Sequence, residues 1–153
     1  MFAFHVRCPE VGFSEYRSIH LRDSEDPPDG DYGFMELYCD EADCDCRRVL
    51  FVVVAPQFPG ETLATFSYGW ESEEFYEEKC AIPALAIRMA GLSVEPLEKQ
   101  SQYAPALFRE CEELLLSDPA YVERLKRHYA LFKKAVLARH WSKKAKRKKR
   151  RRK

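Results

Sequence analysis

Alternation of apolar and polar residues dominates the first half of the chain. Apolar side chains take every second position from Phe2 to Cys8, and the same period recurs around Ile19 and again before Cys39. Successive side chains of a strand point to opposite faces, so a period of two predicts half-buried strands. Residues 49–55 are an almost unbroken apolar run rich in β-branched residues, which is typical of a central strand covered on both faces. The predicted strands cover 2–8, 16–21, 32–39, 49–55 and 62–70.

After residue 71 the pattern changes from strands to helices. Ser72 is a predicted helix cap followed by acidic residues, and Pro83 opens a second short helical segment that ends before a loop at 93–102. Over 104–116, apolar residues recur at steps of three and four, which predicts an amphipathic helix. Asp118 as N-cap and Pro119 at the first helical position open the last helix. Its packing stripe is predicted to contain Val122, Leu125, Tyr129, Phe132 and Val136.

These elements predict an α+β fold. We expect an antiparallel sheet of about five strands with a Cys-rich hairpin, then a C-terminal helical hairpin and a basic tail that is disordered or helical. Residues 26–31, rich in Pro, Asp and Gly, are expected to form a loop between the second and third strands. Residues 1–142 are predicted to form a single domain, with 1–70 mostly strands and 72–142 mostly helices, and 143–153 to form the tail.

Composition supports a folded protein without a membrane segment. The chain has 153 residues, 46% of them hydrophobic, which suffices for one core of ordinary size. No run of 18 apolar residues occurs and the amino terminus does not resemble a secretory leader, so we expect no transmembrane segment and a cytoplasmic location.

The charges are divided along the chain although the formal net charge is zero. All 25 acidic residues lie at or before Glu123, together with 9 basic residues, whereas 16 basic residues and no acidic one follow from Arg124. An acidic body with a basic tail predicts a polyanionic partner, or a tail that folds back on its own body.

The tail itself has ten basic residues among the eleven from 143 to 153. At such density, binding to phosphate backbones is driven by counterion release, so we predict binding to nucleic acid, with RNA, including ribosomal RNA, as the preferred partner. A nuclear-localisation-like signal, an acidic-lipid contact and a solubilising or clamping tail are the alternatives. His140 and Trp141 precede the tail, and Trp141 either stacks on an unpaired base or closes the helix against the core. The predicted nucleic-acid-binding residues are Lys143, Lys144, Lys146, Arg147, Lys148, Lys149, Arg150, Arg151, Arg152 and Lys153.

Three of the six cysteines cluster between two predicted strands. Cys39, Cys44 and Cys46 have the spacing Cys-x4-Cys-x-Cys, which places one thiol at the end of a strand and two at the start of the next. Three thiolates that converge on one point favour zinc, which is tetrahedral and takes sulfur readily. The local spacing does not specify a fourth ligand: His20 is the first choice, Cys8 the second and Cys80 the third. The alternatives are reduced cysteines beside a turn, or a redox pair of Cys44 with Cys46.

No catalytic motif is present, and we assign no catalytic residue. The sequence lacks a phosphate loop, a dinucleotide fingerprint and a Gly-x-Ser-x-Gly turn. The preferred hypothesis is a small zinc-binding accessory protein with a structural metal site, tethered to RNA by its tail and able to contact a protein partner. One alternative is a metal-dependent enzyme with an open coordination position at the cysteines and Glu36 as base. The other is a protein-interaction module regulated by pairing between tail and body.

Overall fold

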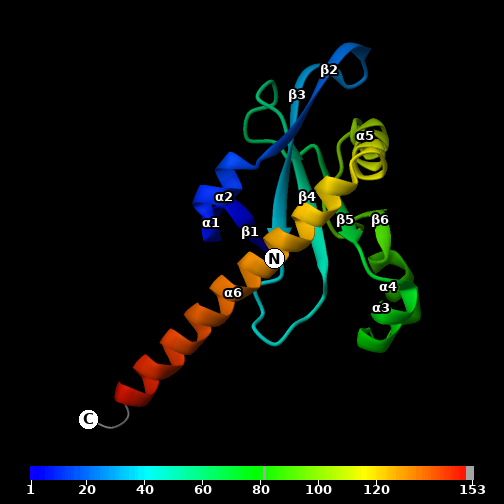
Figure 1. The fold of residues 1–153 in the computed structure, drawn as a ribbon. Coiled ribbons are helices and arrows are strands. Elements are labelled where there is room, and N and C mark those ends of the chain that lie inside the picture. Colours follow the sequence, from blue (N-terminus) through cyan, green and yellow to red (C-terminus); the bar gives the residue numbers. More distant parts are fainter. Residues whose placement is uncertain (81, 151–153) are drawn as a thin grey trace.

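The computed structural model describes residues 1–80 and 82–150 and, within them, all side chains except those of 83, 116 and 143–150. It contains one antiparallel sheet in the order β1-β3-β4-β5-β6, with β2 also paired to β3 (Figure 1). Mixed helix and sheet confirm the α+β prediction. The strands are β1 Phe2–Ala3, β2 Arg17–Glu25, β3 Pro28–Tyr38, β4 Arg48–Val54, β5 Ala64–Gly69 and β6 Gly91–Val94.

The long strand β3 explains why six strands fill a sheet expected to have about five. Strand β4 pairs with residues 33–37 of β3 on one edge. On the other edge, β2 pairs with the first part of β3, up to Phe34, and β1 pairs with its last two residues, Leu37 and Tyr38. Strands β1 and β2 therefore share one position in the sheet.

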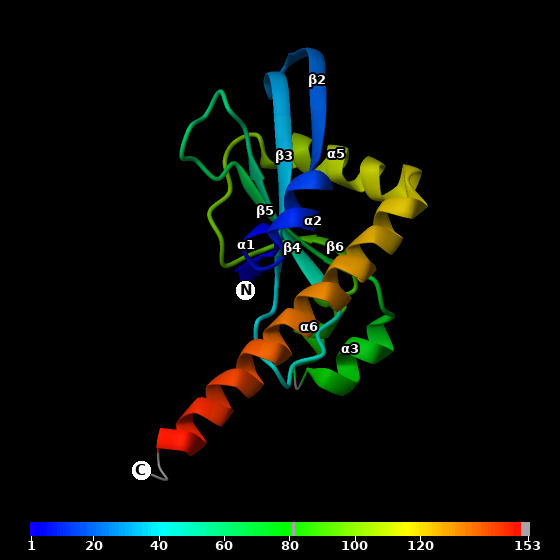
Figure 2. The same ribbon diagram turned by 60° about the vertical axis from the view of Figure 1, so that its left-hand side comes forward.

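Two predicted helix starts are confirmed by their capping hydrogen bonds. The Ser72 hydroxyl accepts from the Phe75 amide at 3.4 Å, and an Asp118 carboxylate oxygen accepts from the Tyr121 amide at 3.2 Å. Helices α5 and α6 meet at Asp118 and diverge from that corner, and α6 then continues beyond the sheet (Figure 2). The helices are α1 Phe4–Arg7, α2 Pro9–Ser14, α3 Glu73–Lys79, α4 Pro83–Met89, α5 Ala104–Ser117 and α6 Pro119–Arg150.

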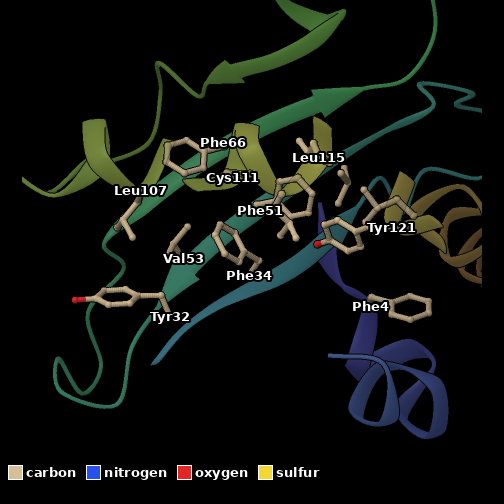
Figure 3. Close-up of a cluster of buried hydrophobic side chains, with 14 of the residues drawn as sticks. Phe4, Tyr32, Phe34, Phe51, Val53, Phe66, Leu107, Cys111, Leu115 and Tyr121 are labelled. Carbon is tan, nitrogen blue, oxygen red and sulfur yellow. The ribbon is translucent and has the colours of Figure 1, made fainter. Parts of the chain in front are cut away.

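The hydrophobic core lies between one face of the sheet and helices α5 and α6 (Figure 3). Phe66 meets Phe108 of α5 edge-on, with ring centroids 5.4 Å apart, and Phe51 stacks on Tyr121 of α6 at 6.3 Å. Burial of one such ring contributes roughly 1.5–3 kcal/mol. The alternate side chains of β4 face the other way, where Leu50 and Val52 line a groove of about 1140 Å³. The prediction that β4 is covered on both faces is therefore correct for one face only.

Three local predictions are wrong. The strand expected over 2–8 ends at Ala3, because Phe4 turns into the core against His128 and Pro9, which lacks an amide donor, opens α2. The loop expected over 26–31 shortens to a turn, because β3 begins at Pro28 and the Tyr32 hydroxyl donates to the Pro28 carbonyl. The first two residues of the loop expected over 93–102 belong to β6, which pairs with the otherwise free edge of β5.

None of the helices in the described part of the chain combines the length and the apolar character needed to cross a membrane.

Candidate metal centre

The three clustered cysteines converge, as their spacing predicts. Cys39 directly follows β3, and Cys44 and Cys46 lie in the loop before β4. Their sulfur atoms all lie within 4.8 Å of one another. Sulfur ligands of a tetrahedral zinc ion stand about 3.8 Å apart, since each Zn–S bond is about 2.3 Å long. The loop, rather than the strand alternation that we expected, brings Cys44 and Cys46 together, because β4 begins only at Arg48.

Two thiols of the cluster have raised pKa values. Burial, with the neighbouring sulfurs of Cys44 and Cys39, raises the pKa of the Cys46 thiol to about 12. Burial also raises the pKa of Cys44, with a further contribution from Cys39. Reactive cysteines need a lowered pKa, so these thiols are unsuited to redox or nucleophilic work on their own. A divalent cation would supply the positive charge that three thiolates lack.

Asp45 attaches the cysteine loop to two helices. Its carboxylate accepts from the Arg47 side chain at 3.1 Å and from the Tyr129 hydroxyl of α6 at 3.2 Å, and it lies 3.7 Å from the Lys79 amino group of α3. The hydrogen bond from Arg47 lowers the pKa of Asp45, so this residue is an anion at neutral pH. Lys133 of α6 donates to the Glu41 carbonyl as well. The loop is therefore fixed against the middle of α6, beside which it runs in Figure 2.

Arg47 holds the chain in an unusual conformation directly after Cys46. Its φ of 42° lies in the left-handed region, which costs a non-glycine residue about 1–2 kcal/mol. Several contacts offset this cost: Arg47 bonds Glu71 at 3.2 Å, its carbonyl accepts from the Tyr76 hydroxyl at 2.8 Å, and its guanidinium covers the Phe75 ring. Strained residues held in this way are common at functional sites.

None of the three predicted fourth ligands joins the thiols. His20 lies on β2, where it bonds Asp31 at 2.8 Å, and eight residues of extended chain, or roughly 25 Å, separate Asp31 from Cys39. Cys8 and Cys80 each follow a residue that reaches the loop: Arg7 lies 3.9 Å from Asp40, and Lys79 contacts Asp45. Within the described residues, however, the close group contains only Cys39, Cys44 and Cys46. His20 is therefore not used as a ligand in the proposal below.

The predicted basic tail continues α6. The helix runs without a break from Pro119 to Arg150 and leads away from the sheet (Figures 1 and 2). The predicted binding residues from Lys143 to Arg150 lie on this helix, and Arg151 to Lys153 lie outside the described residues. Trp141 is 59% exposed, so it does not close the helix against the core.

A buried polar cluster was missed by the sequence analysis. His128 of α6 is 1% exposed, and its Nδ1 lies 2.8 Å from Glu36 Oε2 and its Nε2 3.2 Å from Glu15 Oε2. The Tyr38 hydroxyl donates to the same Glu36 oxygen at 2.8 Å, and Phe4 stacks on the imidazole. Two patterns point to this pair. Glu36 lies on the same face of β3 as the inward-facing Phe34 and Tyr38. His128 falls on the buried face of α6 between Leu125 and Phe132. Glu36 is thus occupied, and it is not placed to act as a base at the cysteines.

Comparison of the chain with protein-family models, with curated proteins and with solved structures finds no match.

Proposed function

We propose that this protein is a zinc-binding accessory protein whose metal site is structural and whose basic helix end attaches it to RNA. The convergence of three sulfur atoms within 4.8 Å carries the metal part of the proposal. Zinc suits a sulfur-rich tetrahedral site and needs no redox chemistry. A fourth protein ligand, from this chain or from a partner, would complete the coordination. We further propose that the protein acts in the cytoplasm.

The structural role follows from what the loop touches. Asp45 contacts α3 and α6, and Glu41 contacts Lys133 of α6. Zinc at the three thiols would hold the loop closed and so keep α6 fixed where it leaves the sheet. The metal would thereby set the direction in which the basic end of the helix points.

The charge distribution supports the RNA part. The ten basic residues at 143–153 follow a body that holds every acidic residue of the chain. Because the helix leads the residues up to Arg150 away from the sheet, folding back of the tail onto its own body is disfavoured. Phosphate contacts of this kind weaken steeply with salt, by about 0.7 in the logarithmic slope for each phosphate of a single strand.

Metal analysis and RNA binding test the two parts separately. We expect purified protein to contain one zinc per chain and a Cys39→Ser/Cys44→Ser/Cys46→Ser variant to contain none, with Cys80→Ser as the matched control that keeps zinc. Replacing the ten basic residues of 143–153 by glutamine should abolish RNA binding, whereas Arg22→Gln/Lys99→Gln in the body should not. Protein that takes up no zinc would refute the metal site. RNA affinity and salt slope that survive the glutamine tail would refute the RNA part.

A metal-dependent enzyme is the second candidate, because only three ligands converge, those of Cys39, Cys44 and Cys46, among the described residues. Three protein ligands and an open position are the arrangement of catalytic zinc. Against this, Glu36 is held by His128 and Tyr38, and the grooves of about 660 and 1140 Å³ are lined by other segments. X-ray absorption of the zinc-loaded protein distinguishes the two, because an exchangeable water as fourth ligand favours the enzyme and a fourth protein ligand excludes it.

A further inference from the structure

We propose that α6 binds RNA as a single strand, with an unpaired base stacked on Trp141 and phosphates bound from Lys134 onward. This inference rests on the proposed function, since it names the form of RNA and the residues that recognise it. It extends the binding surface about two turns closer to the body than the tail itself.

The basic residues of α6 differ in their pairing before and after Lys134. Three basic residues nearer the body are engaged: Lys126 with Glu123, Arg127 with Glu15, and Lys133 with the Glu41 carbonyl. Lys134 and Arg139 are exposed, and none of the ion pairs found in the described part of the chain includes either of them. Lys134 and Arg139 are therefore available to an external anion, and in the sequence further basic residues follow from Lys143 onward.

Trp141 lies between basic residues on one face of the helix. Lys134, Leu137 and Trp141 are spaced by three and four residues, which places them on the same face, and Lys144 and Lys148 continue the same spacing. With a rise of 1.5 Å per residue, Trp141 lies about 10 Å along the axis from both Lys134 and Lys148. Trp141 is 59% exposed and Leu137 is 39% exposed. An exposed aromatic side chain on the helix face that also carries the positions of Lys134 and Lys148 matches a base between flanking phosphates.

This arrangement favours a single strand over a duplex. The bases of a duplex are already stacked and paired, so stacking on Trp141 would require one of them to leave the helix. The major groove of double-stranded RNA is also too deep and narrow for side chains to read. A single strand offers open base faces without either cost.

The same face is poorly suited to a membrane surface. A helix that lies in a bilayer interface needs a continuous apolar face. On α6 the exposed large apolar residues beyond Val136 are Leu137 and Trp141, and the sequence from 143 to 150 contains only Ala145 as a non-basic residue. The apolar contact thus has the size of one or two bases rather than of a membrane anchor.

Binding of one short oligoribonucleotide, alone and annealed to its complement, tests the inference in the full-length zinc-loaded protein. We expect wild type to prefer the single strand. Trp141→Ala should weaken single-strand binding about 5- to 150-fold. It should leave duplex affinity unchanged, and Trp141→Phe should retain most of the preference. Lys134→Gln/Arg139→Gln should lower the logarithmic salt slope by about 1.4, whereas Lys126→Gln should not.

Three outcomes would overturn the inference. Equal loss of single-strand and duplex binding in Trp141→Ala, or no loss, would remove the stacking step. Tighter binding to phosphatidylserine vesicles than to single-stranded RNA, lost in Trp141→Ala, would make this face a membrane contact. A dimer that sediments as such in wild type and dissociates in Trp141→Ala would make it a contact between copies. In the first case the glutamine tail would still abolish RNA binding, so the proposed function would survive. The urea midpoint of Trp141→Ala should fall only slightly, because the side chain is 59% exposed, although its ring contacts that of His140 with centroids 5.9 Å apart.

Discussion

Two polar clusters attach α6 to the sheet, and consecutive residues of the helix serve them. His128 enters the buried cluster with Glu15 and Glu36, whereas Tyr129 bonds Asp45 of the cysteine loop. In the first cluster each polar group finds its partner within the chain, because the two ring nitrogens of His128 lie 2.8 and 3.2 Å from carboxylate oxygens of Glu36 and Glu15. In the second, three thiols lie within 4.8 Å of one another.

We call the histidine cluster of Glu15, Glu36 and His128 closed, because its polar groups bond one another. We call the cysteine cluster of Cys39, Cys44 and Cys46 open, because its proposed cation comes from outside the chain. Buried polar groups are retained when they are hydrogen-bonded, and the histidine cluster meets that condition by itself. At the cysteine cluster the proposed zinc would supply the partner. We therefore expect the first cluster to stabilise the fold with or without metal, and the second to do so when zinc is bound.

The largest expected effect comes from breaking the closed cluster. His128→Leu removes the ring nitrogen that pairs with the buried Glu36, which is 7% exposed, and should lower the free energy of unfolding by up to about 3 kcal/mol. Urea unfolding measures this, with and without zinc, and the loss should be the same in both. His20→Leu is the matched control, because His20 bonds Asp31 at the same 2.8 Å but is exposed, so its loss should stay under about 1 kcal/mol. Equal losses in the two variants would mean that burial does not decide the strength of the pair.

The second prediction concerns the stabilisation of the fold by zinc at the open cluster. Zinc at about 100 times its dissociation constant should raise the free energy of unfolding of wild type by about 2.7 kcal/mol, and a chelator should remove that gain. Cys46→Ser should show little or none of it, while Cys80→Ser should keep it. The measurement is again urea unfolding, in zinc and in chelator. A wild-type midpoint that responds to neither would show the cysteine cluster to be complete as three thiols.

How far the sequence predicts these two clusters depends on the range of their contacts. The cysteine loop is local: its three thiols lie within eight residues, so spacing alone indicates that they converge. The caps Ser72 and Asp118 and the strands that surround residue 50 are local or strongly periodic in the same way. The short helices at Phe4 and Pro9 are not, because what ends β1 is the packing of Phe4 on His128, more than a hundred residues away.

The fourth ligand and the histidine cluster both require long-range register. The sequence predicts His20 near the end of a strand over 16–21, but β2 continues to Glu25, and its pairing with β3 places His20 opposite Asp31 rather than near Tyr38. Glu36 and His128 are 92 residues apart in sequence. Each shows locally as a polar residue on an apolar face, and only the packing of α6 on the sheet reveals that the two positions face each other.

The smallest expected effect concerns the exposed side of the closed cluster, where Glu15 meets Arg127 and His128. The hydrogen bond from Arg127 is the main cause that lowers the pKa of Glu15 below its ordinary 4.5, with a smaller contribution from His128. A carboxyl with a lowered folded pKa stabilises the fold above its unfolded pKa, and that contribution disappears as the pH falls below 4.5 through the folded value. Glu15→Gln should therefore lower the free energy of unfolding at pH 7 by up to about 1 kcal/mol, since Arg127 is exposed and water screens the pair. The difference from wild type should vanish in acid. Unfolding in chelator, which excludes proton release by metal binding, measures this. The control is Glu10→Gln, at an exposed position of helix α2, which ends directly before Glu15. A difference that persists in acid would mean that Glu15 acts through packing, and the closed cluster would then reduce to the buried pair of Glu36 and His128 alone.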